Sequence, residues 1–273
     1  MAKQPEGQTP PKDGSLPPNA FEQFSSTPFS FYVHVPFCAN RCGYCDFNTY
    51  TSQELGGGSR EAWSNAAVAE IEFAGNLLPQ KNEISTVFIG GGTPTLLPAQ
   101  DIASVIHALD DSFGLSADTE VTIEANPDSV SLEQLRQLRE VGVNRISFGM
   151  QSAVPHVLKV LERTHNPESV AKAVSLARDA GFDNVNLDLI YGTPGESVED
   201  LRRSLEEVAA LNVEHVSAYA LIVEEGTSLA RRIKQGDVAL PDDDDMAEKY
   251  EVIDSFLSRL GMQWYELSHW SRA

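Results

Sequence analysis

All three cysteines of this 273-residue chain lie within eight residues of one another, at Cys38, Cys42 and Cys45. Three thiolates spaced in this way on one loop can converge on a single metal centre, and soft sulfur ligands favour iron–sulfur clusters or zinc over hard cations. In a [4Fe–4S] cluster that three cysteines hold, one iron keeps a coordination position for an exchangeable ligand. The spacing therefore predicts a metal centre at which chemistry can take place.

Two simpler explanations of the cysteines stay open at this stage. A structural zinc site would need a fourth ligand, and His34, four residues before Cys38, is the only histidine nearby. Structural zinc sites usually pair their cysteines as two separated knuckles, whereas these three form one run. Inert buried thiols would be scattered along the chain rather than gathered beside Arg41, Gly43 and Asp46 on a polar loop.

Length and charge narrow the class of protein. With 41% hydrophobic residues the chain can bury a full core, and its formal charge of -20 argues against nucleic acid or an anionic membrane as a partner. No apolar run approaches the roughly 20 residues that span a bilayer, and the N-terminus lacks the pattern of a signal peptide. We therefore expect no transmembrane segment and a cytoplasmic protein, and a reducing compartment suits three free thiols.

The order of the expected elements points to an α/β protein. Residues 1–25 are rich in proline and polar residues, which predicts a disordered leader. Strand patterns then alternate with amphipathic helix patterns. Expected strands cover residues 29–36, 84–89, 120–124, 144–148, 184–190 and 215–219, and expected helices cover 63–78, 101–113, 132–141, 170–180 and 201–211.

Three of these helices are expected to end in the same way, at Gly142, Gly181 and Asn212. A residue that accepts a left-handed backbone closes the helix, and one apolar residue starts the next strand. Six parallel strands, each followed by a helix, fit a partial (β/α)6 barrel.

After the sixth strand the pattern changes. The acidic run 241–245 is expected to be a solvated N-terminal cap of a last amphipathic helix that ends at Gly261. Residues 262–270 resemble a short strand without an evident partner. We therefore expect a leader at 1–25, a barrel at 26–222, and at 223–273 an acidic loop, a helix and the start of a C-terminal region that is cut short.

Unexpected polar residues follow the expected strands, at the edge where barrels of this kind place their chemistry. Three glycines after a buried strand would let a ligand approach the backbone, although they could also form only a loose turn. A carboxylate inside an apolar strand, as at Asp188, needs a partner or a ligand to offset its desolvation. Singly, Glu124 and Gln151 could be ordinary strand-end residues, Arg163 a surface arginine, and His34 and His165 structural.

Together these motifs resemble the radical S-adenosylmethionine (SAM) family, which carries the same Cys-x3-Cys-x2-Cys pattern. The resemblance runs from about residue 31 to 220 and is closest to the subfamily of oxygen-independent coproporphyrinogen III dehydrogenases and the heme chaperone HemW. The matching segments are Tyr-Val-His-Val-Pro-Phe-Cys (32–38), Gly-Gly-Gly-Thr-Pro-Thr (90–95), Ile-Glu-Ala-Asn-Pro (123–127), Ser-Phe-Gly-Met-Gln-Ser (147–152) and Leu-Asp-Leu-Ile-Tyr-Gly-Thr-Pro-Gly (187–195).

The resemblance implies a role for each matching residue. The three cysteines would hold the [4Fe–4S] cluster, and its open iron would bind the amino and carboxylate groups of SAM. One electron would then cleave SAM into methionine and a 5′-deoxyadenosyl radical. The implied SAM-binding residues are Tyr32 beside the site, Gly91, Gly92 and Thr93 at the amino-acid moiety, Arg163 at the carboxylate, and Glu124, Gln151 and Asp188 at amino or ribose groups.

The chain departs from the subfamily in two places, and the first of them favours the chaperone. The dehydrogenases carry a fourth cysteine two positions after the third, where this chain has Phe47, and the subfamily's later His-Asn-x-x-Tyr-Trp motif, proposed to bind heme, does not occur before Ala273. We expect a heme chaperone without dehydrogenase activity, with heme or porphyrin as ligand, apo-hemoproteins as acceptors and an electron donor of flavodoxin or ferredoxin type. The alternatives are the dehydrogenase of porphyrin biosynthesis and, more remotely, a structural zinc module.

Overall fold

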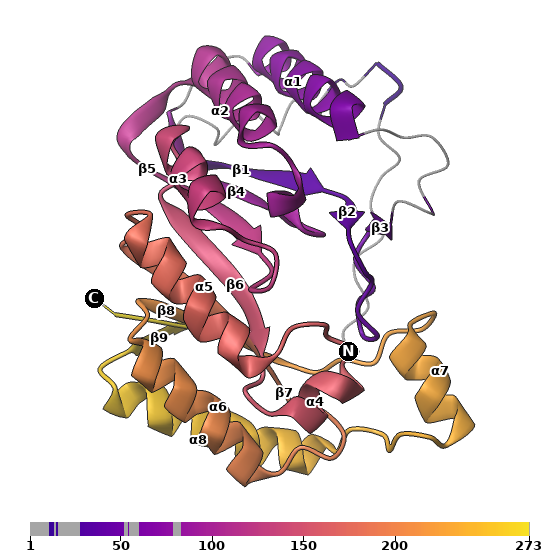
Figure 1. Cartoon of the computed structure of the whole chain (residues 1–273). Helices are drawn as coiled ribbons and strands as arrows, with labels where there is room; N and C mark the ends of the chain where they lie inside the picture. The colour runs from indigo at the N-terminus through magenta and orange to yellow at the C-terminus, as the bar shows by residue number, and fades with distance from the viewer. Residues whose placement is uncertain are drawn as a thin grey trace.

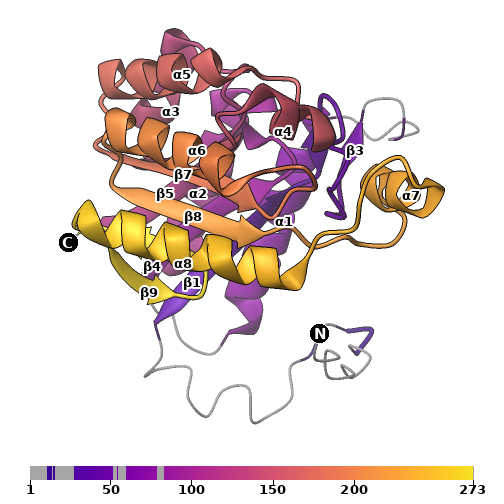
Figure 2. The same ribbon diagram turned by 90° about the horizontal axis from the view of Figure 1, so that it is seen from below.

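The computed structural model describes residues 11–13, 15, 28–51, 54, 60–78 and 83–272. The expected disordered leader therefore lies almost entirely outside the described residues. In the part that is described, the chain forms a strongly curved sheet with helices on its outer side (Figures 1 and 2). None of the described helices is long and apolar enough to cross a membrane.

The sheet contains eight strands in the order β1-β4-β5-β6-β7-β8-β10-β9. Each neighbouring pair from β1 to β8 is parallel, which confirms the expectation of six parallel strands in a partial barrel. A separate two-stranded sheet joins β2 to β3. The strands are β1 (Phe29–Val35), β2 (Phe37–Cys38), β3 (Tyr50–Thr51), β4 (Ile84–Gly91), β5 (Leu115–Ala125), β6 (Arg145–Gln151), β7 (Asn184–Tyr191), β8 (His215–Ala220), β9 (Gln263–Glu266) and β10 (His269–Ser271).

The helices begin and end where local chemistry favours it. Ser197 and Asp200 form a capping box at the start of α6, and Asp242 caps α8 through the backbone N–H of Asp245, so the acidic run is the N-terminal cap that the sequence predicts. The three predicted helix-ending residues have positive φ, as expected. The helices are α1 (Arg60–Leu77), α2 (Ala99–Phe113), α3 (Leu132–Glu140), α4 (Pro155–Val160), α5 (Pro167–Asp179), α6 (Val198–Leu211), α7 (Ser228–Gln235) and α8 (Asp243–Arg259), and Pro94–Leu96 forms the 3-10 helix η3.

The two faces of the parallel strands differ in chemistry. Side chains on the outer face are apolar and fully buried under the helices, as are Ile123, Phe148 and Leu187. Successive side chains of a strand point to opposite faces, so the residues between them line the inner, concave face. Those residues are polar on four adjacent strands: Glu120, Thr122 and Glu124 on β5, Arg145 and Ser147 on β6, Asn184, Asn186 and Asp188 on β7, and His215, Ser217 and Tyr219 on β8.

The expectation that residues 262–270 lack a partner is wrong. The chain turns back after β9, and β10 pairs antiparallel with β8, placing Trp270 opposite Val216. The Trp270 side chain is fully buried, and its indole N–H donates to Asp254 in α8 at 2.9 Å. A three-residue strand carries too little alternation to identify its partner in the sequence, whereas the buried tryptophan secures it in the fold.

Candidate functional site

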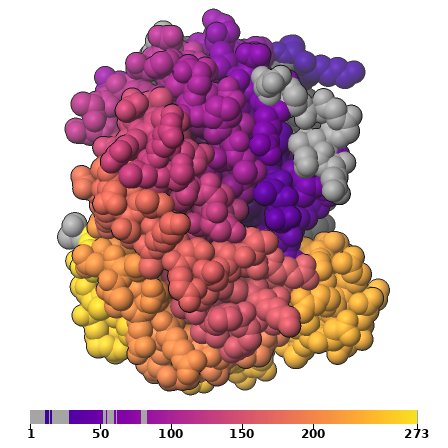
Figure 3. All heavy atoms as spheres, viewed as in Figure 1, coloured from indigo at the N-terminus to yellow at the C-terminus, as the bar shows by residue number. Residues whose placement is uncertain are grey.

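The cysteine loop starts where β1 ends and is held from two sides. The backbone N–H of Gly43 donates to the carbonyl of Leu161 after α4 at 3.1 Å, and the carbonyl of Gly43 accepts from Leu229 in α7 at 2.7 Å. The helix α7 therefore lies beside the loop, where Figure 3 shows it as an orange lobe next to the indigo segment. A Cβ on Gly43 would lie 2.7 Å from the Glu162 side chain, which would have to move to make room.

The thiols of the loop share one electrostatic environment. Burial raises the pKa of Cys38, and the neighbouring Cys42 raises it further. Burial also raises the pKa of Cys45, and both other cysteines add to the effect. Three sulfurs that repel one another as thiolates are stabilised together by a cationic metal centre, which deprotonates coordinating thiols. The donor set thus fits the iron–sulfur cluster that the spacing predicts.

Arg163 lies directly against this loop. One of its terminal nitrogens donates to the Cys42 sulfur at 3.1 Å, and the other donates to the side-chain oxygen of Asn126 at 2.8 Å and to the carbonyl of Gly149 at 3.1 Å. Its Nε donates to Nδ1 of His165 at 3.4 Å, and Nε2 of His165 donates to the carbonyl of Met150 at 3.0 Å. The structure therefore makes His165 a structural residue and places the guanidinium at a cysteine ligand.

The glycine run packs against the cysteine loop. A Cβ on Gly92 would lie 2.4 Å from the carbonyl oxygen of Phe37 and 3.0 Å from the Cys38 sulfur, and a Cβ on Gly91 would lie 2.6 Å from the His34 ring. These glycines are thus needed for contact within the protein, a role that the sequence did not suggest. Their expected role at the SAM amino-acid moiety stays a prediction.

The zinc alternative receives no support from His34. Its Nε2 donates to the carbonyl of Asn48 at 2.8 Å, and its Nδ1 accepts from the hydroxyl of Tyr32 at 3.0 Å, so both ring nitrogens have partners within the protein. Across the described ranges, no three His, Cys, Asp or Glu side chains are gathered closely enough to hold a single metal ion.

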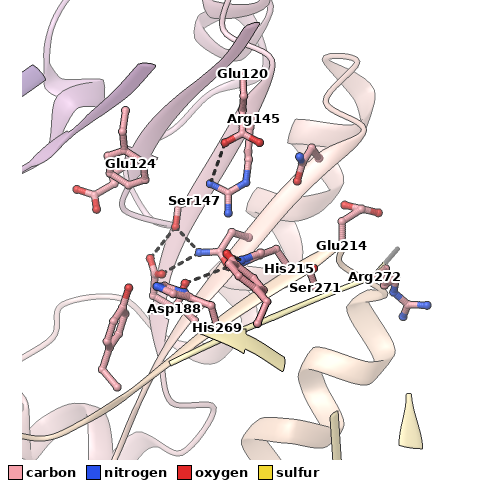
Figure 4. A pocket seen from close by; sticks show the side chains of 16 residues that line it. Glu120, Glu124, Arg145, Ser147, Asp188, Glu214, His215, His269, Ser271 and Arg272 are labelled. Atoms are coloured by element: carbon pink, nitrogen blue, oxygen red, sulfur yellow. Dashed lines mark hydrogen bonds and ion pairs between the residues drawn. The ribbon is translucent and has the colours of Figure 1, made fainter. Parts of the chain in front are cut away.

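A cavity of about 450 Å³ occupies the concave face, where Figure 4 shows its side chains pointing inward from β5, β6, β7, β8 and β10. The pKa of Glu124 is raised to about 7, chiefly by burial and also by nearby Asp188. The N–H of Gly91, which donates to Glu124 at 2.8 Å, acts in the opposite direction and lowers this pKa. Burial also raises the pKa of Asp188, which accepts hydrogen bonds from Ser147 at 2.7 Å and Asn186 at 2.8 Å. The Asp188 carboxylate, which the sequence predicts to need a partner or a ligand, therefore has hydrogen-bond donors within the protein.

A smaller cavity of about 130 Å³ lies beside the cysteine loop and is lined by Cys42, Thr93 and Arg163, among others. The predicted site residues thus fall into two groups. Thr93, whose hydroxyl accepts from Asn126 at 3.1 Å, and Arg163 lie at this smaller cavity, whereas Glu124 and Asp188 line the larger one.

Gln151 and Tyr32 complete the predicted set. Gln151 has φ of +61° at a register shift at the end of β6, and such left-handed strain in a non-glycine residue is typical of functional sites. Its amide lies on the Arg163 side, since a Cβ on Gly149 would meet Gln151 at 2.8 Å and Arg163 at 3.3 Å. Tyr32 is exposed and stacks on Phe88, which lines the larger cavity, with ring centres 6.1 Å apart.

Sequence reasoning missed most of the concave face. It noted Glu124 and Asp188 but not the other residues that share their face, because the apolar residues between them made the strands look wholly buried. The alternation itself is visible in the sequence, as in Asn184-Val-Asn186-Leu-Asp188. The residues missed in this way include Arg145, Ser147, Asn186, His215, Ser217 and Tyr219, together with Tyr265 and His269 from the C-terminal hairpin.

Comparisons with known proteins identify the family of this chain. A family model described as the radical SAM superfamily matches residues 32–208. The chain is 51% identical over 245 residues to the heme chaperone HemW of Mycobacterium tuberculosis (90% of this chain, 63% of the relative) and 36% identical over 247 residues to that of Bacillus subtilis (89% and 64%). The solved coproporphyrinogen III oxidase (HemN) from Escherichia coli, described as a radical SAM enzyme, superposes with a TM-score of 0.80 at 29% identity, covering 93% of this chain and 58% of that one. The chain therefore spans less than two thirds of the length of these relatives.

Proposed function

The chain belongs to the radical SAM superfamily, and from that premise we propose that it binds a [4Fe–4S] cluster through Cys38, Cys42 and Cys45, binds SAM beside that cluster, and acts as a heme chaperone. The observation that carries the cluster is the group of three free thiols with the Arg163 guanidinium on the sulfur of Cys42. When bound, the cluster and SAM together would supply reductive cleavage of a carbon–sulfur bond.

The chain's own residues would prepare this site in three ways. Arg163 donates to the Cys42 sulfur and so places a fixed positive charge beside the cysteine loop. Glu124 accepts from the N–H of Gly91 and, when ionised, can hold a cationic amino group. The contacts of Gly43 with the segments after α4 and at the start of α7 hold the loop in place and restrict the access of water.

Heme handling is supported by the relatives of this chain. At 51% and 36% identity, the two reported relatives are heme chaperones, whereas the solved oxidase is 29% identical. Phe47 gives separate support, because an apolar ring that is 59% exposed stands where the dehydrogenases have a thiol. We propose that heme passes to apo-hemoproteins in the cytoplasm, that a flavodoxin or ferredoxin reduces the cluster, and that residues 26–222 form the core that binds the cofactors.

Two parallel assays under anaerobic conditions test this function. The first titrates heme into the reconstituted protein and follows the Soret band, and the second supplies reductant, SAM and coproporphyrinogen III and measures carbon dioxide. We expect a Soret shift that saturates near one heme per chain and no carbon dioxide above that of a Cys42→Ala control. Carbon dioxide release without heme binding would favour the dehydrogenase and overturn the chaperone proposal.

A further inference from the structure

The large cavity has a second end, away from the cysteine loop, that the function proposed above does not use. It lies near the amino ends of the strands, and Figure 4 shows the Arg145 guanidinium pointing into it from β6. Arg145 is only 8% exposed. An arginine buried to this degree normally has a close carboxylate or several hydrogen bonds, because an unpaired charge is unfavourable away from water.

Within the described ranges, Arg145 has only one long ion pair and one hydrogen bond. Its single hydrogen bond runs from one terminal nitrogen to the Thr122 hydroxyl at 3.2 Å, and its nearest carboxylate, Glu120, is 3.9 Å away with a side chain that is 41% exposed. The guanidinium has five N–H donors in a planar fork. Most of those donors therefore face a cavity in which no described side chain accepts from them.

The two histidines at this end of the cavity have lowered pKa values. Burial lowers the pKa of His215 to about 3, with Arg145 and His269 adding to the effect, so this imidazole is neutral at pH 7. Its two nitrogens contact Asn186 at 2.6 Å and the Tyr265 hydroxyl at 2.7 Å. Burial likewise lowers the pKa of His269, whose Nδ1 has no hydrogen-bond partner among the described residues. This end of the cavity thus holds a guanidinium whose one ion pair, to Glu120, is long, beside neutral imidazoles, and Glu214 and Arg272 line the same cavity.

Aromatic rings line the same cavity as Arg145. Tyr265 stacks on His269 with ring centres 5.8 Å apart, and Tyr219 meets the same imidazole edge-on at 5.7 Å. Phe88 lines the cavity on the β4 side. A planar guanidinium fork matches a carboxylate in two parallel hydrogen bonds, and aromatic walls match a flat apolar body.

We propose that this end of the cavity is a carboxylate-binding subsite centred on Arg145, which takes a carboxylate carried on a flat apolar body. The inference rests on the proposed function when that body is heme, whose propionates supply the carboxylates. A free small carboxylate has the same chemistry and is the other source. Glu120 competes weakly for the guanidinium in the absence of the ligand.

The test compares heme with heme dimethyl ester, which has the same ring without the charges, on the full reconstituted chain. We expect heme to bind about 10-fold to 100-fold more tightly than the ester, as for a charge-assisted hydrogen-bonded pair. Arg145→Gln should remove that preference, and Glu120→Gln should widen it because the competing carboxylate is gone. Arg136→Gln on the exposed side of α3 is the matched control for loss of one positive charge and should change neither affinity.

The outcomes separate this subsite from the proposed function. Equal binding of heme and its ester by the wild-type chain overturns the subsite and leaves heme binding intact. If no porphyrin binds, the chaperone function fails, and the thermal stability of the chain is then measured with and without succinate. A rise in melting temperature that Arg145→Gln abolishes supports a subsite for small carboxylates, and the absence of any rise overturns the subsite. If Arg145→Gln does not fold, Glu120→Gln decides, and an unchanged preference overturns the proposal.

Discussion

Two buried arginines, Arg163 and Arg145, stand at opposite ends of the concave region, and their surroundings differ. Arg163 donates to a cysteine sulfur, a side-chain amide, a backbone carbonyl and an imidazole. Arg145 donates to one hydroxyl, and its nearest carboxylate is 3.9 Å away. Both have a histidine as neighbour, yet only His165 holds its arginine through a hydrogen bond.

The two arginines therefore differ in how many of their N–H donors remain free to bind a ligand. A guanidinium whose donors are used is fixed in orientation and gives a preorganised positive charge at the cysteine loop. A guanidinium with free donors gains most when a ligand supplies acceptors, because its burial has already removed water. We therefore assign the first arginine to a resident cofactor and the second to a ligand that binds and leaves.

Removing the thiol next to Arg163 should have the largest effect. We expect Cys42→Ala to lose nearly all reconstituted iron, because the three cysteines are the chain's only thiolates and a cluster with two ligands is unstable. Arg145→Gln, in the larger cavity and away from the cysteine loop, should retain the full iron content. Iron and sulfide analysis after anaerobic reconstitution measures both, and equal loss in the two variants would break the comparison.

Replacing each arginine separately by glutamine compares the contributions of the two residues to SAM binding. We expect Arg163→Gln to weaken SAM binding to the reduced cluster about 10-fold to 100-fold and to leave iron content intact, because a charged hydrogen-bond donor is lost beside the ligand. Arg145→Gln should change SAM affinity by less than about 3-fold. Equilibrium binding of labelled SAM gives both values, and loss of iron from Arg163→Gln as severe as in Cys42→Ala would reassign Arg163 to a structural role.

The acid between the two arginines gives a pH dependence. The pKa of Glu124 is raised to about 7 in the folded chain from its ordinary value of 4.5, so its protonated form is favoured by folding. Its contribution to stability is full below about pH 4.5 and is lost as pH rises through about 7. Glu124→Gln should therefore raise the free energy of unfolding by about 1 kcal/mol more at pH 8.5 than at pH 6.

Denaturant unfolding at the two pH values checks the stability effect of Glu124→Gln, and SAM binding gives an independent check on the same residue. Because ionised Glu124 can hold the cationic amino group, wild-type affinity for SAM should rise with pH through about 7, and the variant should show a flat profile. Parallel pH profiles for the two proteins would remove Glu124 from the SAM site.

The smallest effect is expected from the residue that orients Arg163. His165 is neutral at pH 7, since burial lowers its pKa to about 4, and it accepts from Nε of Arg163. We expect His165→Phe to weaken SAM binding about 3-fold, the size of one neutral hydrogen bond, with unchanged iron content. His165→Gln, which can still accept, should recover most of that loss, and no difference between the two variants would contradict the positioning role.

The sequence predicts the framework of this molecule well because its signals are local. Helix-closing residues such as Gly142 and Asn212 act through their own backbone, and the parallel strands carry continuous apolar residues on their outer face. The cysteine spacing is equally local. These features need no knowledge of distant contacts, and the structure has them where the sequence predicts.

What the sequence could not predict depends on residues far apart in the chain. The contact of Arg163 with Cys42 joins positions 121 residues apart, and the backbone bond from Leu229 brings α7 onto the cysteine loop. The pairing of β10 with β8 depends on a hairpin whose direction no local pattern fixes. The polar concave face is different, since its alternation is present in β7 and was hidden by the apolar residues between.

The most direct test of the account is metal analysis of the wild-type chain after anaerobic reconstitution, together with its spectrum before and after reduction in the presence of SAM. The account predicts about four irons and four sulfides per chain, broad absorption near ~400 nm from thiolate-to-iron charge transfer, and a change in the paramagnetic signal of the reduced cluster when SAM is added. A colourless protein that holds one zinc per chain and does not respond to SAM would contradict it.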